Sequence, residues 1–236
     1  MSPDSLKWTP AGAPGRIALN GELVRLESVD PSRHSEPLFT ASHGAGGDSR
    51  LWDYLSYGPF ASQDEFTAWL EQRAASADPL FFAVVDMATM RARGMASYMR
   101  IEPEHGVIEI GHIWFVPALQ RTRQATEAIF LLASNAFDTL GYRRLEWKCD
   151  AQNQPSRRAA ERFGFMFEGV FRQHMVIKGR NRDTAWFAMT DGDWPLRRAA
   201  FKAWLTSGNF DESGRQRASL SSLRALIERE SQWYQE

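Results

Sequence analysis

The segment from Glu109 to Ala128 contains the residues whose types and spacing point most directly to chemistry. An apolar, strand-like run ends at Pro117, and a short loop rich in cations and small residues then leads into a helical repeat. The first turn of a helix presents N–H groups without partners and the positive end of the helix dipole, which together attract phosphate. Arg121 and Arg123 can add charge-assisted contacts to such a group. An ordinary solvated loop between a strand and a helix is the plain alternative.

Two titratable groups, Glu109 and His112, lie near the middle of this strand-like run. Residues three apart on a strand point to opposite faces, so we expect only one of them to face a substrate. Cys149 is the only cysteine, which excludes an intramolecular disulfide and a thiolate-rich metal site. Its place at the end of an apolar strand is more typical of a core residue than of a nucleophile. The five histidines show no metal-ligand spacing.

The rest of the pattern predicts the elements that position these residues. Alternating apolar runs predict strands, and apolar residues at spacings of three and four predict helices. Asn20-Gly21 predicts a tight hairpin, and Ser62 with Glu65 predicts a capping box at the start of a helix. The expected strands cover 16–19, 22–26, 80–85, 95–101, 107–116, 145–149, 165–175 and 184–189, and the expected helices cover 30–43, 125–140, 156–162, 196–205 and 219–230.

This order of elements predicts an α/β fold with a mostly antiparallel sheet, entered by one strand–helix–strand crossover. Residues 1–15, rich in Pro, Gly and Ala, are expected to form a flexible leader. We expect one domain over residues 16–195 and a helical C-terminal extension over residues 196–236.

The charge balance excludes some classes of function. The 236 residues include 28 Lys and Arg against 29 Asp and Glu, a formal net charge of −1, which gives no electrostatic support for nucleic-acid binding. No run approaches the roughly 18 apolar residues of a membrane span. The N-terminus lacks the basic and then apolar pattern of a secretion signal. We therefore expect a cytoplasmic protein that binds neither nucleic acid nor a membrane, as a monomer or a homodimer.

Gln120, Arg123 and Ala125 fall on the three patterned positions of Gln/Arg-x-x-Gly-x-Gly/Ala. This is the acyl-CoA-binding motif of the GCN5-related N-acetyltransferase (GNAT) superfamily, which the segment resembles. The chain departs from the family at Arg123, where glycine usually permits close approach of the backbone. An arginine there must place its side chain away from the ligand or across it, where it would clasp a phosphate.

Further blocks resemble the ribosomal-protein alanine acetyltransferase (RimJ/RimL-like) branch. Residues 153–169 look like its Asn-x-x-Ser…Gly-Phe-x-x-Glu-Gly signature, and residues 109–112 resemble its Glu-x-Gly-aromatic strand. Residues 51–60 resemble the helix–loop segment on its acceptor side. Order and spacing agree from roughly residue 22 to residue 195. The resemblance implies a GNAT-type fold, with a mixed, mostly antiparallel central sheet flanked by helices.

The resemblance also implies how acetyl-CoA binds, with its pantetheine arm between two strands that splay apart near Phe115 and Cys149. Asn153 is equally well explained as a helix N-cap. An acceptor wall of Trp52, Tyr54 and Tyr57 has helix packing as its plain alternative. The residues implied to bind acetyl-CoA are Trp114, Phe115, Val116, Gln120, Arg121, Thr122, Arg123, Gln124, Ala125, Thr126 and Asn153.

The implied reaction is direct transfer of acetyl from the thioester to a primary amine. Glu109 matches the branch pattern and is the expected base, unless it is a buried structural carboxylate paired with an arginine. His112 stands where the branch has an aromatic residue and is expected in the core. The tyrosine that the wider superfamily often uses is replaced by Ala160, so Ser156 is the expected proton donor to the thiolate. A structural serine in the first turn of a helix is the alternative.

The acceptor is expected to be a protein N-terminal α-amine or a small-molecule amine. At pH 7 an α-amine is about 14% neutral and a lysine amine only about 0.04%, an advantage of roughly 350-fold for the α-amine. A non-catalytic acyl-CoA-binding or interaction module is the competing class, supported by Arg123 and by the missing tyrosine.

Overall fold

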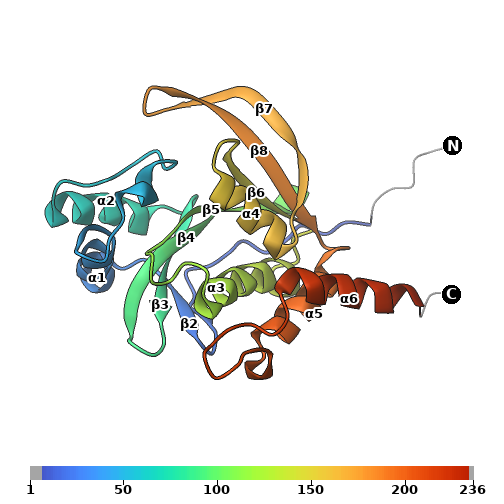
Figure 1. Cartoon of the computed structure of the whole chain (residues 1–236). Helices are drawn as coiled ribbons and strands as arrows, with labels where there is room; N and C mark the ends of the chain where they lie inside the picture. The colour runs from blue at the N-terminus through green and yellow to red at the C-terminus, as the bar shows by residue number, and fades with distance from the viewer. Residues whose placement is uncertain (1–6, 234–236) are drawn as a thin grey trace, which may run out of the picture.

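The protein is described by a computed structural model that covers residues 7–233 (Figure 1). Residues 1–6 of the expected leader lie outside the described part of the chain. Within it, Trp8 Nε1 donates a hydrogen bond of 2.8 Å to the Glu104 carbonyl, and the Gly12 N–H donates one of 2.7 Å to the Leu140 carbonyl. Residues 8–12 of the segment expected to be flexible therefore lie against the domain.

One mixed sheet organises the fold, in the order β1-β2-β3-β4-β5-β6-β8-β7. Every neighbouring pair is antiparallel except β5 and β6, which helix α3 connects. This confirms the predicted sheet with a single crossover. The strands are β1 (Leu19–Asn20), β2 (Val24–Ser28), β3 (Leu80–Asp86), β4 (Arg91–Glu102), β5 (Val107–Phe115), β6 (Arg144–Asp150), β7 (Met166–Ile177) and β8 (Arg180–Thr190).

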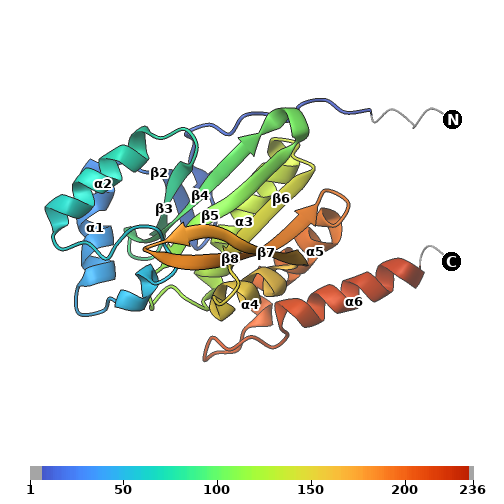
Figure 2. The same ribbon diagram turned by 90° about the horizontal axis from the view of Figure 1, so that it is seen from above.

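The helices lie on the two faces of this sheet (Figures 1 and 2). Phe82 and Tyr98 point toward α3, where Tyr98 Oη hydrogen-bonds the Leu132 carbonyl. Phe81 points the other way and packs on Trp69 of α2. We call these sides the α3 face and the α2 face. The helices are α1 (Pro31–His43), α2 (Gln63–Ala75), α3 (Arg123–Ser134), α4 (Gln154–Phe163), α5 (Trp194–Leu205) and α6 (Leu220–Trp233), with short turns at Ser49–Trp52, Pro103–His105, Asn135–Thr139 and Ser207–Asn209.

The core has one layer on each side of the sheet. Leu132 and Ala136, from the predicted helical stripe, are fully buried on the α3 face. The α2 face carries an aromatic layer in which Trp52, Phe60 and Phe66 are buried, with rings at centroid distances of 5.2–5.5 Å. Apolar burial of this extent stabilises both layers.

The N-terminal hairpin forms, but its turn is not the predicted two-residue turn at Asn20-Gly21. Asn20 pairs with Arg25, so the loop is longer, and the Gly21 N–H binds the Val24 carbonyl. The carboxylate of Glu127, in α3, accepts three backbone N–H groups from residues 22–24 at 2.7–3.0 Å. A tertiary contact therefore sets the shape of this loop, which local turn propensity alone does not predict.

Strands β5 and β6 separate after a short paired stretch. Their register runs only from Val107 opposite Arg144 to Glu109 opposite Glu146, although β5 continues to Phe115. Against β4, residues 111–114 of β5 contain one residue more than the opposing residues 95–97, which is a β-bulge. His112 lies in this bulge with a φ of 51°. The sheet therefore opens next to a locally strained backbone.

The C-terminal extension packs on the helices of the α3 face, as Figure 1 shows for α5 and α6. Arg224, in α6, donates hydrogen bonds to the carbonyls of Glu161 and Arg162 at the end of α4. Helices α5 and α6 thus confirm the predicted helical tail and tie it to α4. Among residues 7–233 we find no helix with the length and apolarity required to span a membrane.

Candidate functional site

The loop before α3 presents a row of unsatisfied donors. Thr122 is the N-cap, and its hydroxyl accepts the Ala125 N–H at 3.2 Å. The backbone N–H groups of residues 121–124 have no hydrogen-bond partner among the described residues. Four such groups at the positive end of a helix have the chemistry to bind a phosphate. Arg121 adopts a φ of 61°, which turns the chain sharply into this arrangement.

Arg123 points away from that row of donors. Its Nη2 donates a hydrogen bond of 2.7 Å to the Leu205 carbonyl, and its guanidinium lies 4.5 Å from the centre of the Phe210 ring. Both partners belong to the C-terminal extension. Of the two orientations that the sequence left open, the structure has the one directed away from the loop. Thr126, one turn further along α3, is also held by another helix, because Arg162 Nη1 in α4 donates a hydrogen bond of 3.1 Å to its hydroxyl.

The open edge of β5 lies directly before this loop. The Val116 N–H donates to Arg93 in β4, and N–H groups alternate in direction along a strand, so the Phe115 N–H points toward the gap between β5 and β6. Gln120 Nε2 donates to the Phe115 carbonyl at 2.8 Å, which closes the loop onto the strand. Trp114 is buried and packs on Trp52, with the ring centroids 5.2 Å apart. The predicted residues 114–116 thus border the gap.

Glu109 is the last residue of β5 that pairs with β6, so it lies where the gap begins, on the α2 face. Its carboxylate is 3.0 Å from Lys148 Nζ and 3.4 Å from Arg100 Nη1, and both Glu109 and Lys148 are almost fully buried. Burial raises the pKa of Glu109, and the opposing charges of Lys148 and Arg100 only partly offset this effect. Lys148 also pairs with Glu146 and stacks on Trp186 at 3.8 Å.

His112 lies on the same face as Glu109, so the prediction that they point to opposite faces was wrong. The extra residue of the bulge shifts the alternation of β5. The His112 ring packs on Phe81, with centroids 5.0 Å apart, and stacks on Tyr57 at 5.6 Å. Burial lowers the pKa of His112 to about 4, assisted by the charges of Arg73 and Arg182. The imidazole is therefore neutral at pH 7.

Ser156 and Asn153 lie on the opposite, α3 face. The Asn153 side chain is the N-cap of α4 and accepts the Ser156 N–H at 3.1 Å. The Ser156 hydroxyl accepts a hydrogen bond of 3.0 Å from Trp147 Nε1, which leaves the hydroxyl proton free to be donated. Cys149 is buried next to it, and burial raises the pKa of the thiol. Cys149 is a core residue and not an activated nucleophile.

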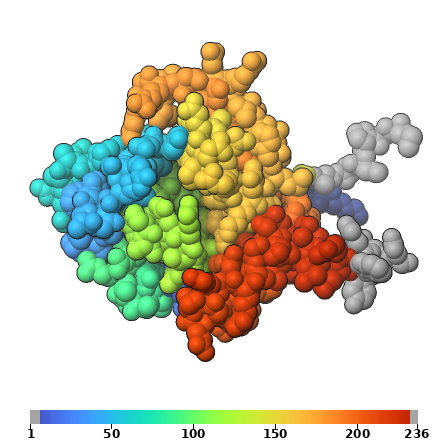
Figure 3. All heavy atoms as spheres, viewed as in Figure 1, coloured from blue at the N-terminus to red at the C-terminus, as the bar shows by residue number. Residues whose placement is uncertain are grey.

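The three residues predicted to form an aromatic acceptor wall, Trp52, Tyr54 and Tyr57, lie in three different environments. Trp52 is buried within the aromatic layer, whereas Tyr54 is exposed and donates from its hydroxyl to the Gln152 carbonyl at 3.3 Å. Tyr57 faces His112, and its buried hydroxyl has no partner among the described residues. Beyond Tyr57, the β7–β8 hairpin reaches over the α2 face (Figures 1 and 3), and Lys178 Nζ at its tip donates to the carbonyls of Trp52 and Gly58.

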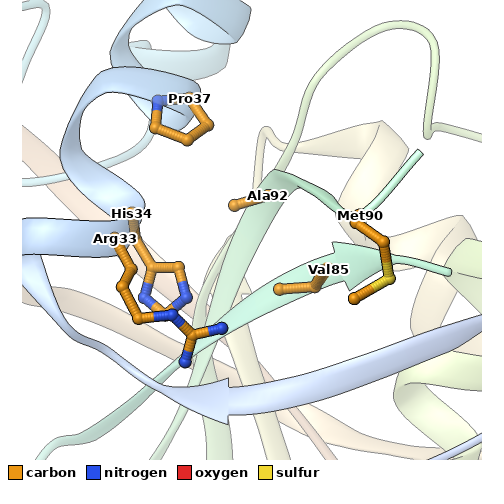
Figure 4. Close-up of a pocket in the computed structure, with 6 residues that line it drawn as sticks. All are labelled: Arg33, His34, Pro37, Val85, Met90 and Ala92. Carbon is orange, nitrogen blue, oxygen red and sulfur yellow. The ribbon is translucent and has the colours of Figure 1, made fainter.

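Two cavities border α1. One, of about 230 Å³, lies between α1 and the β3–β4 hairpin and contains none of the predicted site residues; Figure 4 shows His34 and Arg33 from α1 facing Val85 across it. The other, of about 450 Å³, is bordered by Val116 and Ala118 at the start of the loop. Residues 7–233 contain no group of three His, Cys, Asp or Glu side chains arranged to hold a metal.

The sequence reasoning missed Lys148, Arg73 and Arg182. Lys148 reaches Glu109 because β5 and β6 are adjacent, and the charges of Arg73, in α2, and Arg182, in β8, act on His112. The charged residues Glu146 and Lys148 within the strand-like run 145–149 were the local signal, since a buried lysine on a strand normally has a partner.

Comparison with known proteins agrees with this geometry. A family model described as "Acetyltransferase (GNAT) domain" matches residues 25–166. A solved GCN5-related N-acetyltransferase from Brucella melitensis is 49% identical, with a TM-score of 0.90 over 93% of this chain and 99% of that chain.

Two curated relatives match shorter regions. "Uncharacterized N-acetyltransferase p20" from Bacillus licheniformis is 29% identical over 46% of this chain and 60% of its own length. "Putative ribosomal N-acetyltransferase YdaF" from Bacillus subtilis (strain 168) is 27% identical over 43% of this chain and 55% of its own length. The chain thus spans less than two thirds of either of these relatives. The family match, the near-complete structural match and the splayed strands together lead to one conclusion: the chain belongs to the GNAT family of N-acetyltransferases.

Proposed function

We propose that this protein transfers an acetyl group from acetyl-CoA to a primary amine by direct attack. The observation that carries the proposal is the row of four free N–H groups at residues 121–124, placed beside the gap between β5 and β6. The family uses acetyl-CoA, and the unsatisfied donors fit its pyrophosphate. When bound, acetyl-CoA supplies an activated thioester, and the chain's residues supply position and proton transfer.

The two faces of the sheet have different roles in this reaction. The base and the amine lie on the α2 face, and the proton donor lies on the α3 face. Backbone groups of residues 114–116 hold the pantetheine arm in the gap, with Gln124, Ala125 and Thr126 around the phosphates and Asn153 on the α4 side. The Phe115 N–H stabilises negative charge on the thioester oxygen as the amine attacks. The amine approaches from the α2 face, where Tyr54 and Tyr57 border its path and Trp52 supports them from behind.

Glu109 takes the amine proton, through water, on the α2 face. Its raised pKa makes it a stronger base than an exposed carboxylate. Its position where the gap between β5 and β6 begins also supports this role. Ser156 gives its proton to the departing thiolate from the α3 face. The hydrogen bond from Trp147 Nε1 supports the hydroxyl in that orientation.

The acceptor is a protein N-terminal α-amine or a small-molecule amine. The modest base supports this choice, because α-amines are already partly neutral near pH 7. One curated relative carries the name of a ribosomal N-acetyltransferase, which agrees with an α-amine acceptor.

A thiol-release assay with acetyl-CoA over a panel of amines tests the proposal. We expect Glu109→Gln and Ser156→Ala to lower kcat by about 100-fold or more while the Kd for acetyl-CoA changes little. Glu212→Gln, at an exposed position of the extension, serves as the matched control. Tight acetyl-CoA binding measured by calorimetry without turnover of any amine would instead identify a non-catalytic acyl-CoA-binding module.

A further inference from the structure

Two arginines whose charges act on the His112 imidazole have no acidic partner among the residues that the structure describes. Arg73 comes from α2 and Arg182 from β8, and neither forms an ion pair with any residue that the structure describes. The Nε atom of each is buried without a hydrogen-bond partner. Arg73 Nη2 donates to Gln72 Oε1 at 3.1 Å, and its Nη1 has no hydrogen-bond partner among the described residues.

Aromatic rings hold Arg73 in place. Its guanidinium lies 5.6 Å from the centre of the Trp69 ring and 6.0 Å from that of Phe81. Phe81 in turn packs on His112. An arginine stacked in this way presents its N–H edge in a fixed plane, which suits bidentate binding of a carboxylate or a phosphate.

Two other cations of this face are paired with carboxylates. Lys148 is paired with both Glu109 and Glu146, and Arg100 lies 3.4 Å from Glu109. Arg73 and Arg182 therefore represent positive charge near His112 that no carboxylate of the described residues compensates. Because half-buried guanidinium groups lose hydration, a bound anion would compensate both of them.

We propose that Arg73 and Arg182 form a subsite for an anionic group of the acceptor, so that the preferred acceptor is an amine that carries a carboxylate or a phosphate. The inference rests on the proposed function, because it names the acceptor class of the same site. The anionic group docks between α2 and β8 next to His112, and the amine thereby reaches the gap beside Glu109.

Matched acceptors test this subsite. Tripeptide amides with an N-terminal alanine keep the α-amine constant, while the second or third residue is Asp or Asn in one arm and phosphoserine or serine in the other. We expect kcat/KM to be at least 10-fold higher for an acidic member of a pair, mainly through a lower KM. The two arms distinguish a carboxylate from a phosphate as the preferred anion.

Variants of the two arginines test whether they cause the preference for acidic acceptors. Arg73→Gln and Arg182→Gln are each expected to reduce the ratio of acidic to neutral kcat/KM by about 10-fold. Arg182→Lys is expected to retain part of the ratio, and Arg180→Gln, at the exposed tip of the same hairpin, to retain all of it. The Kd for acetyl-CoA and the circular dichroism spectrum report whether each variant is folded.

The outcomes separate the inference from the proposed function. Acetylation of acidic and neutral peptides at equal rates, or a preference that survives both glutamine variants, overturns the anionic subsite alone. If acetyl-CoA binds but no amine of the panel is acetylated, the proposed function fails and the subsite fails with it.

Discussion

Lys148 and Glu109 form a buried ion pair, 3.0 Å apart, at the point where β5 and β6 separate. Two charges removed from water are tolerated only because each compensates the other, and loss of one partner leaves an uncompensated buried charge. The pair therefore connects the stability of the sheet with the protonation of the proposed base.

Replacement of Lys148 with methionine tests this connection. We expect the free energy of unfolding to fall by about 3–5 kcal/mol, because Glu109 and Glu146 lose their shared cation. The Lys148 charge lowers the pKa of Glu109, so its loss should move the acidic limb of the pH–rate profile to higher pH. Urea unfolding and a pH profile of kcat/KM measure the two effects. Lys148→Arg should restore the acidic limb; an unchanged limb in Lys148→Met argues against Glu109 as the base.

The raised pKa of Glu109 also predicts how stability depends on pH. In the unfolded chain this carboxyl titrates near 4.5, whereas in the folded protein it holds its proton to higher pH. The folded state binds more protons in that interval, so stability decreases as the pH rises from about 4.5 through the folded pKa. We expect the Tm of the wild type, minus that of Glu109→Gln, to be larger at pH 4.5 than at pH 8. A difference independent of pH would contradict burial as the cause.

His112 predicts a dependence of the opposite sign. Burial lowers its pKa from 6.5 to about 4, so the unfolded chain binds the proton more tightly. Stability is fully present above pH 6.5 and is lost as the pH falls toward 4, by on the order of 2–3 kcal/mol. Urea unfolding at pH 7.5 and pH 4.5 should show a smaller loss for His112→Gln than for the wild type. His105→Gln, on an exposed turn, provides the control.

Arg123 is predicted to act on acetyl-CoA through the backbone of its loop and not through its own charge. Arg123→Ala removes the hydrogen bond to Leu205 and the contact with Phe210, so we expect the Kd for acetyl-CoA to rise by about 5- to 10-fold. The slope of log Kd against log salt concentration should not change, since no charge–phosphate contact is lost. A decrease of that slope would indicate instead that Arg123 clasps a phosphate in the complex.

The elements of the fold were largely predictable, because they depend on periodicity within short segments. The stripe that includes Ile129 and Leu132 is buried as expected, and Ser62 caps α2 through the Glu65 N–H. The exception at Asn20-Gly21 has a nonlocal cause, since the carboxylate that holds the loop belongs to Glu127, more than 100 residues later.

The site was less predictable, because its contacts depend on register and on side-chain direction. The single inserted residue of the bulge places His112 on the same face as Glu109, and no pattern in the sequence predicts this bulge. Lys148 and Arg182 become neighbours of the site only through the pairing of three strands. Motif resemblance located the loop at residues 120–125, but it gave no direction for the Arg123 side chain.

That direction has a consequence for how the protein can change over evolution. Arg123 is anchored on residues 205 and 210, and Arg162, which holds Thr126, stacks on Trp204. We therefore expect a mutation in the last third of α5 or just after it to alter the shape of the proposed coenzyme loop, some eighty positions earlier. We expect relatives that lack this tail to have glycine at position 123, because the loop would then need its own backbone freedom.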